Sequence, residues 1–177
     1  MILNNCKNIN KKNKKGFTLM EVVIILFIST IGVAASLSLA LKSAYFQSVQ
    51  KDLLGVVFLA NEGLELMTNF RDTNMIIGND YDNFDGFGSA GIGENFYKVD
   101  YYTLLATSTE NIDETILQQD EVGFYVYNTS TDSIFKRMIT TRAETSASTT
   151  VESWIKWSRR GEDYNYKLET VLYDLSF

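Results

Sequence analysis

The residue whose position most invites chemistry is Glu21, an acid at the beginning of a long apolar segment. The next charged residue is Lys42, so the twenty residues Val22–Leu41 carry no charge. A carboxylate inside a bilayer costs about 2.5–3.5 kcal/mol on insertion scales, so Glu21 is either functional or lies at the membrane edge near the headgroups. In a dry bundle of helices it would need a cationic partner, and that pairing would fix the register between neighbours.

The rest of the chain offers few of the usual catalytic groups. It contains no histidine and a single cysteine, Cys6, so the commonest general base and the commonest metal ligand are missing. A hydrolase that uses two carboxylates stays open, because 22 acidic residues make chance pairs common and nothing singles out two of them. We therefore expect no catalytic residue, no metal site and no cofactor.

The apolar segment predicts a transmembrane helix over residues 17–41. Twenty apolar residues that rise about 1.5 Å each cover the hydrocarbon core of a membrane. Basic residues lie mostly before it: Lys7, Lys11, Lys12, Lys14 and Lys15 precede the segment and Lys42 alone follows closely. The positive-inside rule then predicts a single membrane pass with the N-terminus in the cytoplasm.

A short motif surrounds Glu21. It reads GFTLME from Gly16 to Glu21, follows the basic residues Lys14 and Lys15, and precedes the apolar segment. This motif resembles the prepilin signal shared by type IV pilins and type II secretion pseudopilins. The resemblance implies that a prepilin peptidase cuts between Gly16 and Phe17, that the new amino group of Phe17 is methylated, and that Glu21 serves both processing and assembly.

The same resemblance implies partners and a role. The partners would be the prepilin peptidase and methyltransferase, other pilin or pseudopilin subunits, an inner-membrane assembly platform and the lipid bilayer. Many members of the superfamily have a proline midway along the apolar helix, but this chain has no proline. That departure favours a minor pilin or minor pseudopilin, a structural subunit that is not an enzyme, of a cell-surface filament used in adhesion, motility, DNA uptake or secretion.

Two alternatives remain open at this point. A conventional signal peptide could be cut after the small residues Ala34-Ala35-Ser36. The protein could also be a membrane-anchored binding protein of the cell surface with a single N-terminal transmembrane helix.

Removal of a leader over residues 1–16 would take away five of the sixteen basic residues, leaving 11 against 22 acidic residues and a net charge of −11. Such an acidic chain does not fit nonspecific binding of nucleic acid.

Helical periodicity continues beyond the membrane segment, over residues 42–72. Apolar residues recur there at steps of three or four, which predicts one helix from about Phe17 to about Asp72. Gly55 and Gly63 are weak points that cost about 1 kcal/mol each relative to alanine, so a break at either glycine is an alternative. We interpret Arg71 and Asp72 as structural residues near the helix end rather than as a ligand site.

Residues 73–177 predict a β-rich head domain. Its first part, residues 78–95, is a loop whose Asp80, Asp82 and Asp85 suggest calcium, but their spacing fails the EF-hand pattern and turns explain them adequately. Alternation then predicts strands over 96–105, 122–127, 134–141, 151–158 and 164–173. We expect an α+β fold in which the long N-terminal helix packs on an antiparallel sheet of about four or five strands.

Three details complete the prediction for the head. Lys136 and Arg137 are adjacent in a strand, so one of them must face water. Residues 143–150 are predicted to form a loop, and residues 159–163 a five-residue hairpin loop. A cluster near that loop could stack on sugars or single-stranded nucleic acid, although packing within the sheet is the commoner role of such residues; its members are Trp154, Trp157, Arg159 and Arg160.

Overall fold

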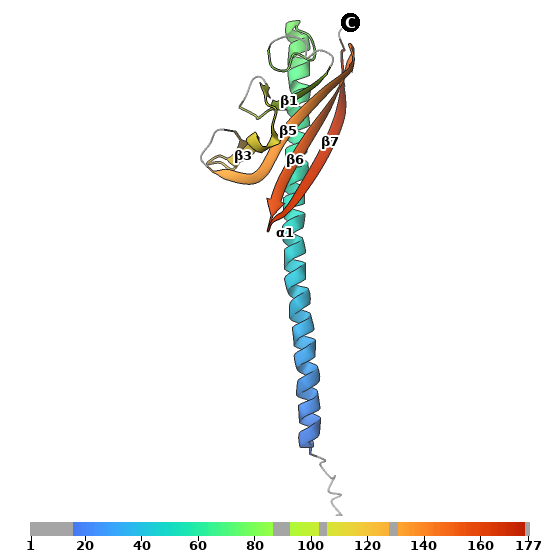
Figure 1. Cartoon of the computed structure of the whole chain (residues 1–177), viewed down its shortest axis with the longest axis vertical. Helices are drawn as coiled ribbons and strands as arrows, with labels where there is room; N and C mark the ends of the chain where they lie inside the picture. The colour runs from blue at the N-terminus through green and yellow to red at the C-terminus, as the bar shows by residue number, and fades with distance from the viewer. Residues whose placement is uncertain (1–15, 87–92, 103–105, 128–130, 176–177) are drawn as a thin grey trace, which may run out of the picture. The chain divides into compact units, whose positions relative to one another are not determined.

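The first element of the chain is one helix, α1 (Leu19–Ile77), of 59 residues (Figure 1). It is seen in a computed structural model that describes residues 16–86, 93–102, 106–127 and 131–175. The chain divides into two compact units, Met1–Val49 and Gln50–Phe177. The described part of the first unit is almost entirely helix. The second, called the head unit below, contains the rest of α1 and all the strands.

The C-terminal end of α1 is fixed by Gly78. This glycine has a φ of 82°, its N–H donates to the carbonyl of Met75, and the N–H of Asn79 donates to the carbonyl of Asn74 over 2.8 Å. This pair of bonds is a Schellman motif, which needs a residue in the left-handed region and therefore favours glycine. The helix consequently runs about one turn beyond the predicted end at Asp72, and it does not break at Gly55 or Gly63.

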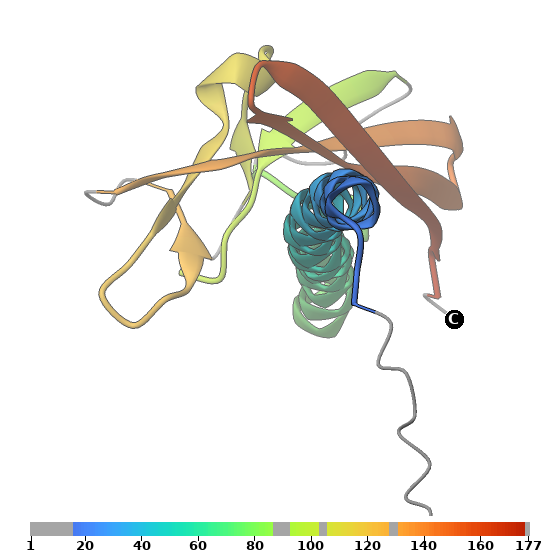
Figure 2. The same cartoon turned by 90° about the horizontal axis from the view of Figure 1, so that it is seen from below.

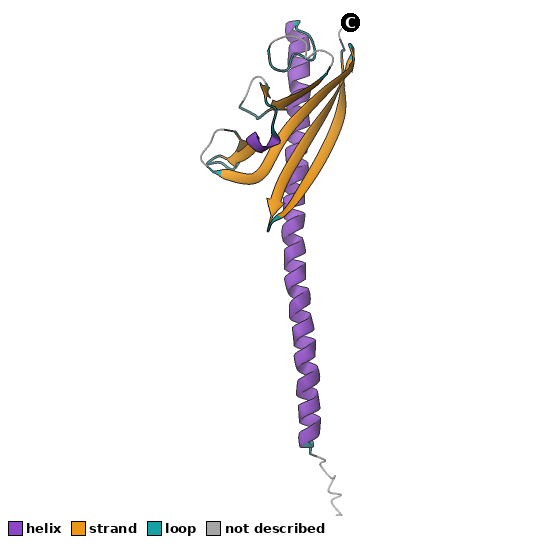
Figure 3. Ribbon diagram, in the orientation of Figure 1, coloured by secondary structure: helices purple, strands orange, loops and turns teal. Residues whose placement is uncertain are grey.

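The strands of the described residues form one antiparallel sheet of seven members (Figure 3). The long strand β5 lies at its centre and pairs with β6 along one edge and with β1 and β3 along the other. The elements in order are β1 (Glu94–Lys98), β2 (Thr107–Ser108), the 3₁₀ turn η1 (Ile112–Glu114), β3 (Ile116–Gln119), β4 (Tyr125–Val126), β5 (Asp132–Thr145), β6 (Ser148–Arg159) and β7 (Glu162–Tyr173). The predicted α+β fold is therefore confirmed, and the two strands that the sequence did not predict are β2, of two residues, and β3, of four.

Both predicted loops of the C-terminal half are much shorter than expected. Within residues 143–150 the strands continue until Thr145 pairs with Ser148. Within residues 159–163 only Arg160 and Gly161 turn, with φ angles of 53° and 83°. Two consecutive residues with positive φ make the turn type whose twist matches two paired strands. The result is three long strands joined by two-residue turns.

Two predicted strands are shorter than the sequence pattern suggests. The strand expected over residues 96–105 ends at Lys98, and Tyr101, within the predicted range, is 55% exposed. The strand expected over residues 122–127 is reduced to β4, because a side chain before it organises a turn. One carboxylate oxygen of Asp120 accepts three backbone N–H bonds, from Val122, Gly123 and Phe124. Such local side-chain bonds compete with strand pairing.

The core of the head unit forms where one stripe of α1 packs on the sheet (Figure 2). The stripe is helical in spacing and alternates with exposed residues, as the sequence predicted. One cluster joins Val56, Leu59 and Ala60 of α1 to Leu117, Phe135, Ile155 and Trp157. The other joins Leu64 and Met67 of α1 to Phe84, Tyr97, Val99, Ala106, Ile139, Val151 and Leu172.

Gly63 marks the closest approach of the helix to the sheet. A Cβ atom on this residue would lie 2.8 Å from Ile139 Cδ1 and 2.9 Å from Ser153 Oγ. Real Cβ atoms do not come that near to other heavy atoms, so the helix can reach this depth only with a glycine here. Gly63, which lowers helix propensity, is thus the residue that allows α1 to pack closely on the sheet.

Candidate functional site

The candidate site begins with the cap of α1. Thr18 precedes the first helical residue, and its Oγ1 accepts a hydrogen bond of 3.2 Å from the backbone N–H of Glu21. The carbonyl of Thr18 also accepts the N–H of Val22 over 3.2 Å. A threonine followed three residues later by a glutamate is the spacing of a capping box, which satisfies N–H groups that would otherwise lack partners at a helix start. The sequence spacing could have predicted this cap.

The cap places Glu21 in the first turn of α1, close to the positive end of the helix dipole, where a carboxylate is favoured. Its side chain is exposed in the single chain, and so are Gly16 and Phe17, the latter at 73%. The structure therefore brings Gly16, Phe17 and Glu21 together at one accessible helix start. Lys14 and Lys15, with the rest of the predicted leader, lie outside the described residues.

The surface that follows is apolar on every side of the helix. Each residue of Val22–Leu41 is exposed in the single chain, including large side chains such as Phe27, Ile31 and Leu37. Among the described residues, α1 is the one helix long and apolar enough to cross a membrane. A helix that is apolar all round is stable only when lipid or other helices cover it.

Two of the four hydroxyl groups within this apolar surface, which would oppose such burial, are bonded to the helix itself. Thr30 Oγ1 donates to the carbonyl of Phe27 and Ser36 Oγ to the carbonyl of Gly32, each over 2.8 Å. In a medium without water an unsatisfied polar group costs several kcal/mol, and these internal bonds remove that cost for both side chains.

The cluster at the β6–β7 turn does not form a common surface. Trp157 is buried in the core and stacks on Tyr164, with ring centroids 5.4 Å apart. Trp154 points to the opposite face of β6, where Lys167 Nζ lies 5.0 Å from the centroid of its ring. Arg159 forms an ion pair with Asp52 of α1. These contacts give the cluster a packing role, the commoner of the two interpretations of the sequence.

The other candidates are likewise built into the fold. Arg71 forms an ion pair of 2.6 Å with Asp72 inside α1, so both remain structural. In the described ranges, the aspartates of residues 78–86 do not join any group of three or more acidic, histidine or cysteine side chains that could hold a metal ion. Residues 87–92 of the predicted loop are not described.

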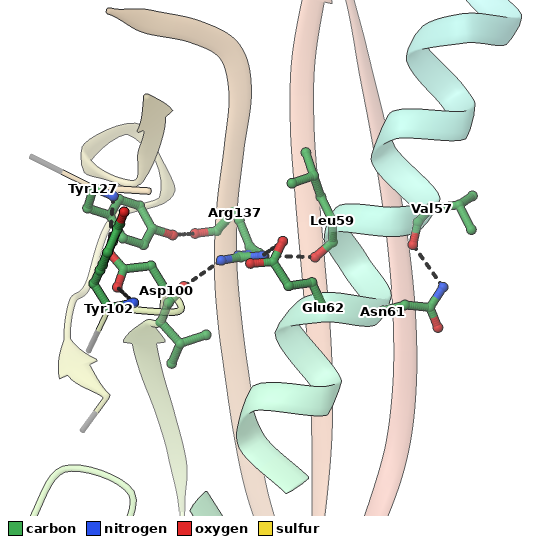
Figure 4. A network of polar contacts seen from close by, with 9 residues as sticks. Val57, Leu59, Asn61, Glu62, Asp100, Tyr102, Tyr127 and Arg137 are labelled. Carbon is green, nitrogen blue, oxygen red and sulfur yellow. Dashed lines mark hydrogen bonds and ion pairs between the residues drawn. The ribbon is translucent and has the colours of Figure 1, made fainter. Parts of the chain in front are cut away.

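The sequence did not single out the most buried charge, Arg137. Its side chain is fully buried between α1 and the sheet (Figure 4). Nη1 donates to the carbonyl of Leu59 over 3.0 Å, Nη2 to the carbonyl of Val99 over 2.6 Å, and Nη1 lies 3.3 Å from Glu62 Oε2. The Arg137 side chain thus links α1 to the segment that follows β1. Its neighbour Lys136 is the residue that reaches solvent, where it pairs with Asp113 over 2.6 Å.

Burial and hydrogen bonding shift several tyrosine pKa values in the head unit. Burial raises the pKa of Tyr97 to about 12, and the charge of Asp85 adds to the effect. Burial also raises the pKa of Tyr127, whose hydroxyl donates to the carbonyl of Arg137 over 2.8 Å. Both tyrosines are therefore neutral at physiological pH and act as core residues with one hydrogen-bonding group.

Three features of α1 define a pilin-like α+β protein. The helix has a capped start with an accessible acid in its first turn, its N-terminal half is apolar on every side, and its C-terminal half packs on an antiparallel sheet. Residues 11–37 match the family model described as the prokaryotic N-terminal methylation motif. Searches among curated proteins and among solved structures found no significant match. The chain thus carries a prepilin-type signal, consistent with the type IV pilin and pseudopilin superfamily, and this signal implies peptidase processing and assembly into a pilus or pseudopilus.

Proposed function

We propose that the protein is a minor pilin or minor pseudopilin. The observation that carries the proposal is the methylation motif of residues 11–37, directly followed by a helix that is apolar on every side. In this proposal residues 1–16 are a leader that the prepilin peptidase removes, and residues 17–41 anchor the subunit in the inner membrane with its N-terminus in the cytoplasm. Residues 42–72 continue the helix, and residues 73–177 form the extracytoplasmic head.

Assembly follows from the same segment. When subunits leave the membrane for a filament, their apolar helices cover one another in place of lipid. The carboxylate of Glu21 then lies in a dry bundle and needs a cation. Cleavage between Gly16 and Phe17 creates one, the methylated amino group of Phe17, on the same or a neighbouring subunit. The mated pair fixes the axial register, so Glu21 acts as an assembly charge and not as a catalyst.

The proposal for a minor subunit rests on two features of the chain. It has no proline that could locally open the apolar helix, and it has no pair of cysteines to close the C-terminal loop that many major pilins carry. The partners in this role are the prepilin peptidase and methyltransferase, the other subunits of the filament, and the assembly platform of the inner membrane.

The test is the Glu21→Ala variant, expressed with the host's other filament components. The variant keeps the backbone N–H that Thr18 caps, so the start of the helix is preserved while the charge is lost. We expect normal membrane insertion and a drop of at least about tenfold in the amount recovered in sheared filaments, because an amino group remains buried without its partner.

The matched control is Glu65→Ala, which removes an exposed acid from the same helix within the head unit. It should enter filaments like the unchanged protein. Normal assembly of the Glu21→Ala variant would show that the charge pairing, and with it the proposed mode of assembly, is wrong.

A further inference from the structure

The head unit contains a groove with an unusual lining. It has a volume of about 480 Å³ and lies between α1 and the segment that leads into β4. Four aromatic side chains line it: Phe58 from α1, and Tyr101, Phe124 and Tyr125 from the connecting segments and β4. Among the described residues that line it, Glu62 is the one carboxylate and none is a lysine or an arginine.

The aromatic rings of this groove, called the aromatic groove below, are open to solvent. Phe58 is 65% exposed, Tyr101 55% and Phe124 54%. The rings of Tyr101 and Phe124 are in contact, with centroids 5.6 Å apart and planes tilted by 40°. The hydrophobic effect disfavours several exposed aromatic rings in one place. Such a cluster on a water-exposed surface therefore indicates a binding site.

The charge beneath the rings is negative. Glu62 is part exposed and lies 3.3 Å from Arg137, whose shorter bonds go to two backbone carbonyls. Asp100, buried on the other side of that arginine, accepts N–H bonds from Tyr102 and Tyr127 (Figure 4). Two carboxylates and one guanidinium leave one net negative charge. A cation that enters the groove therefore meets both a carboxylate and the negative faces of the rings.

The hydrogen-bonding capacity of the aromatic groove narrows the kind of cation. A primary ammonium brings three N–H donors and a guanidinium five, and each needs an acceptor when it leaves water. Glu62 supplies one carboxylate, which it shares with Arg137 at 3.3 Å, and the rest of the lining is mostly apolar and offers few further acceptors. An ammonium whose nitrogen carries methyl groups has no such donors, and its methyl groups pack on aromatic faces.

We propose that the aromatic groove binds an alkylated ammonium group, of the trimethylammonium type, by cation–π contacts and the charge of Glu62. All the residues involved belong to the head unit, so the site does not depend on cleavage at Gly16 or on assembly into a filament. It gives the head a ligand-binding function in addition to the proposed structural role.

The probe is choline, titrated into the full-length protein in maltoside micelles and followed by calorimetry and by ligand-observed NMR. Detergents and lipids with phosphocholine groups are left out, because they carry the proposed ligand. Two other small molecules separate the contribution of the positive charge from that of the methyl groups. The compound 3,3-dimethylbutan-1-ol has the shape of choline without its charge, and ethanolamine has the charge with N–H donors in place of methyl groups.

Tyr101→Ala and Phe124→Ala should each weaken choline binding by about 2- to 30-fold, the range that single cation–π contacts span. Glu62→Gln keeps the shape of the side chain and should also weaken binding. The matched control is Tyr173→Ala, since Tyr173 on β7 is 56% exposed but does not line the groove. It should leave the affinity for choline unchanged. Tryptophan fluorescence, to which Trp157 in the core contributes, verifies that each variant is folded.

The proposal requires choline to bind more tightly than both other molecules. Equal binding of the uncharged alcohol would identify a merely hydrophobic groove, and equal binding of ethanolamine would rule out selection for methyl groups. Absence of choline binding, or an equal loss in the Tyr173→Ala variant, would also overturn the assignment.

Discussion

Substitution of Gly63 by alanine tests how closely α1 is seated on the sheet. The new methyl group would lie 2.8 Å from Ile139 Cδ1, 2.9 Å from Ser153 Oγ and 3.3 Å from Arg137 Cδ. All three neighbours are fully buried, so they have little room to move aside. Overpacking of this kind typically costs about 1–3 kcal/mol, and alanine returns about 1 kcal/mol through its better helix propensity. We expect a net loss of up to about 2 kcal/mol.

Gly55 provides the matched control on the same helix. A Cβ atom there meets nothing nearer than Phe135 Cζ at 3.9 Å, an ordinary contact. Gly55→Ala should therefore stabilise the head unit by about 0.5–1 kcal/mol. Because the gain in helix propensity is common to both variants, the difference between them isolates the cost of the contact, about 1–3 kcal/mol.

The assay is urea unfolding of the full chain in mild detergent, followed by tryptophan fluorescence, to which Trp157, buried beside α1, contributes. Ile139→Val, which removes the atom nearest to the new methyl group, should cost less in the Gly63→Ala background than alone. If Gly63→Ala is as stabilising as Gly55→Ala, the helix does not approach the sheet as described, and the account of Gly63 is refuted.

Two further predictions concern the buried polar groups. Arg137→Ala should destabilise the head unit by about 3–5 kcal/mol in the same assay, because it removes the hydrogen bonds that Arg137 donates to the carbonyls of Leu59 and Val99 and the cation beside Glu62. Lys136→Ala, at a solvent-facing pair, should have little effect, and equal losses would contradict this reasoning. The pKa of Tyr97 is about 12 in the folded protein and about 10 in the unfolded chain. Protonated Tyr97 therefore contributes its full share to the free energy of unfolding below pH 10, and this share is lost as the pH rises towards 12. Tyr97→Phe should therefore lose less stability between pH 9 and pH 11.5 than the unchanged protein. An identical pH dependence of the two proteins would disprove the raised pKa of Tyr97.

The sequence predicted the elements far better than their ends. Periodicity identified α1 and the long strands because each buries one continuous face. It could not distinguish Gly55 from Gly63, since the difference lies in distant residues of β5 and β6 that only the folded chain brings near. It also overestimated the β6–β7 loop, because Arg160 is an unusual residue for a position with positive φ.

The same limit applies to the polar groups. Alternation showed that either Lys136 or Arg137 must face water but gave no preference, and arginine is rarely buried completely. The burial of Arg137 is explained only by the carbonyls of α1 and of the segment after β1, which lie far away in sequence. Tyr101 lies within the strand predicted over residues 96–105, but the strand ends at Lys98 and Tyr101 lines the aromatic groove. The helix start was predictable because Gly16, Phe17, Thr18 and Glu21 are contiguous in sequence.

The central claim is that the N-terminal segment is a processed assembly element, and the identity of the mature N-terminus tests it most directly. Intact-mass measurement and N-terminal analysis of the protein isolated from its own host should give a chain that begins at Phe17 and carries one added methyl group on its amino nitrogen. A chain that keeps Met1, or one that begins after Ala34, would contradict the claim and favour a membrane-anchored or secreted binding protein.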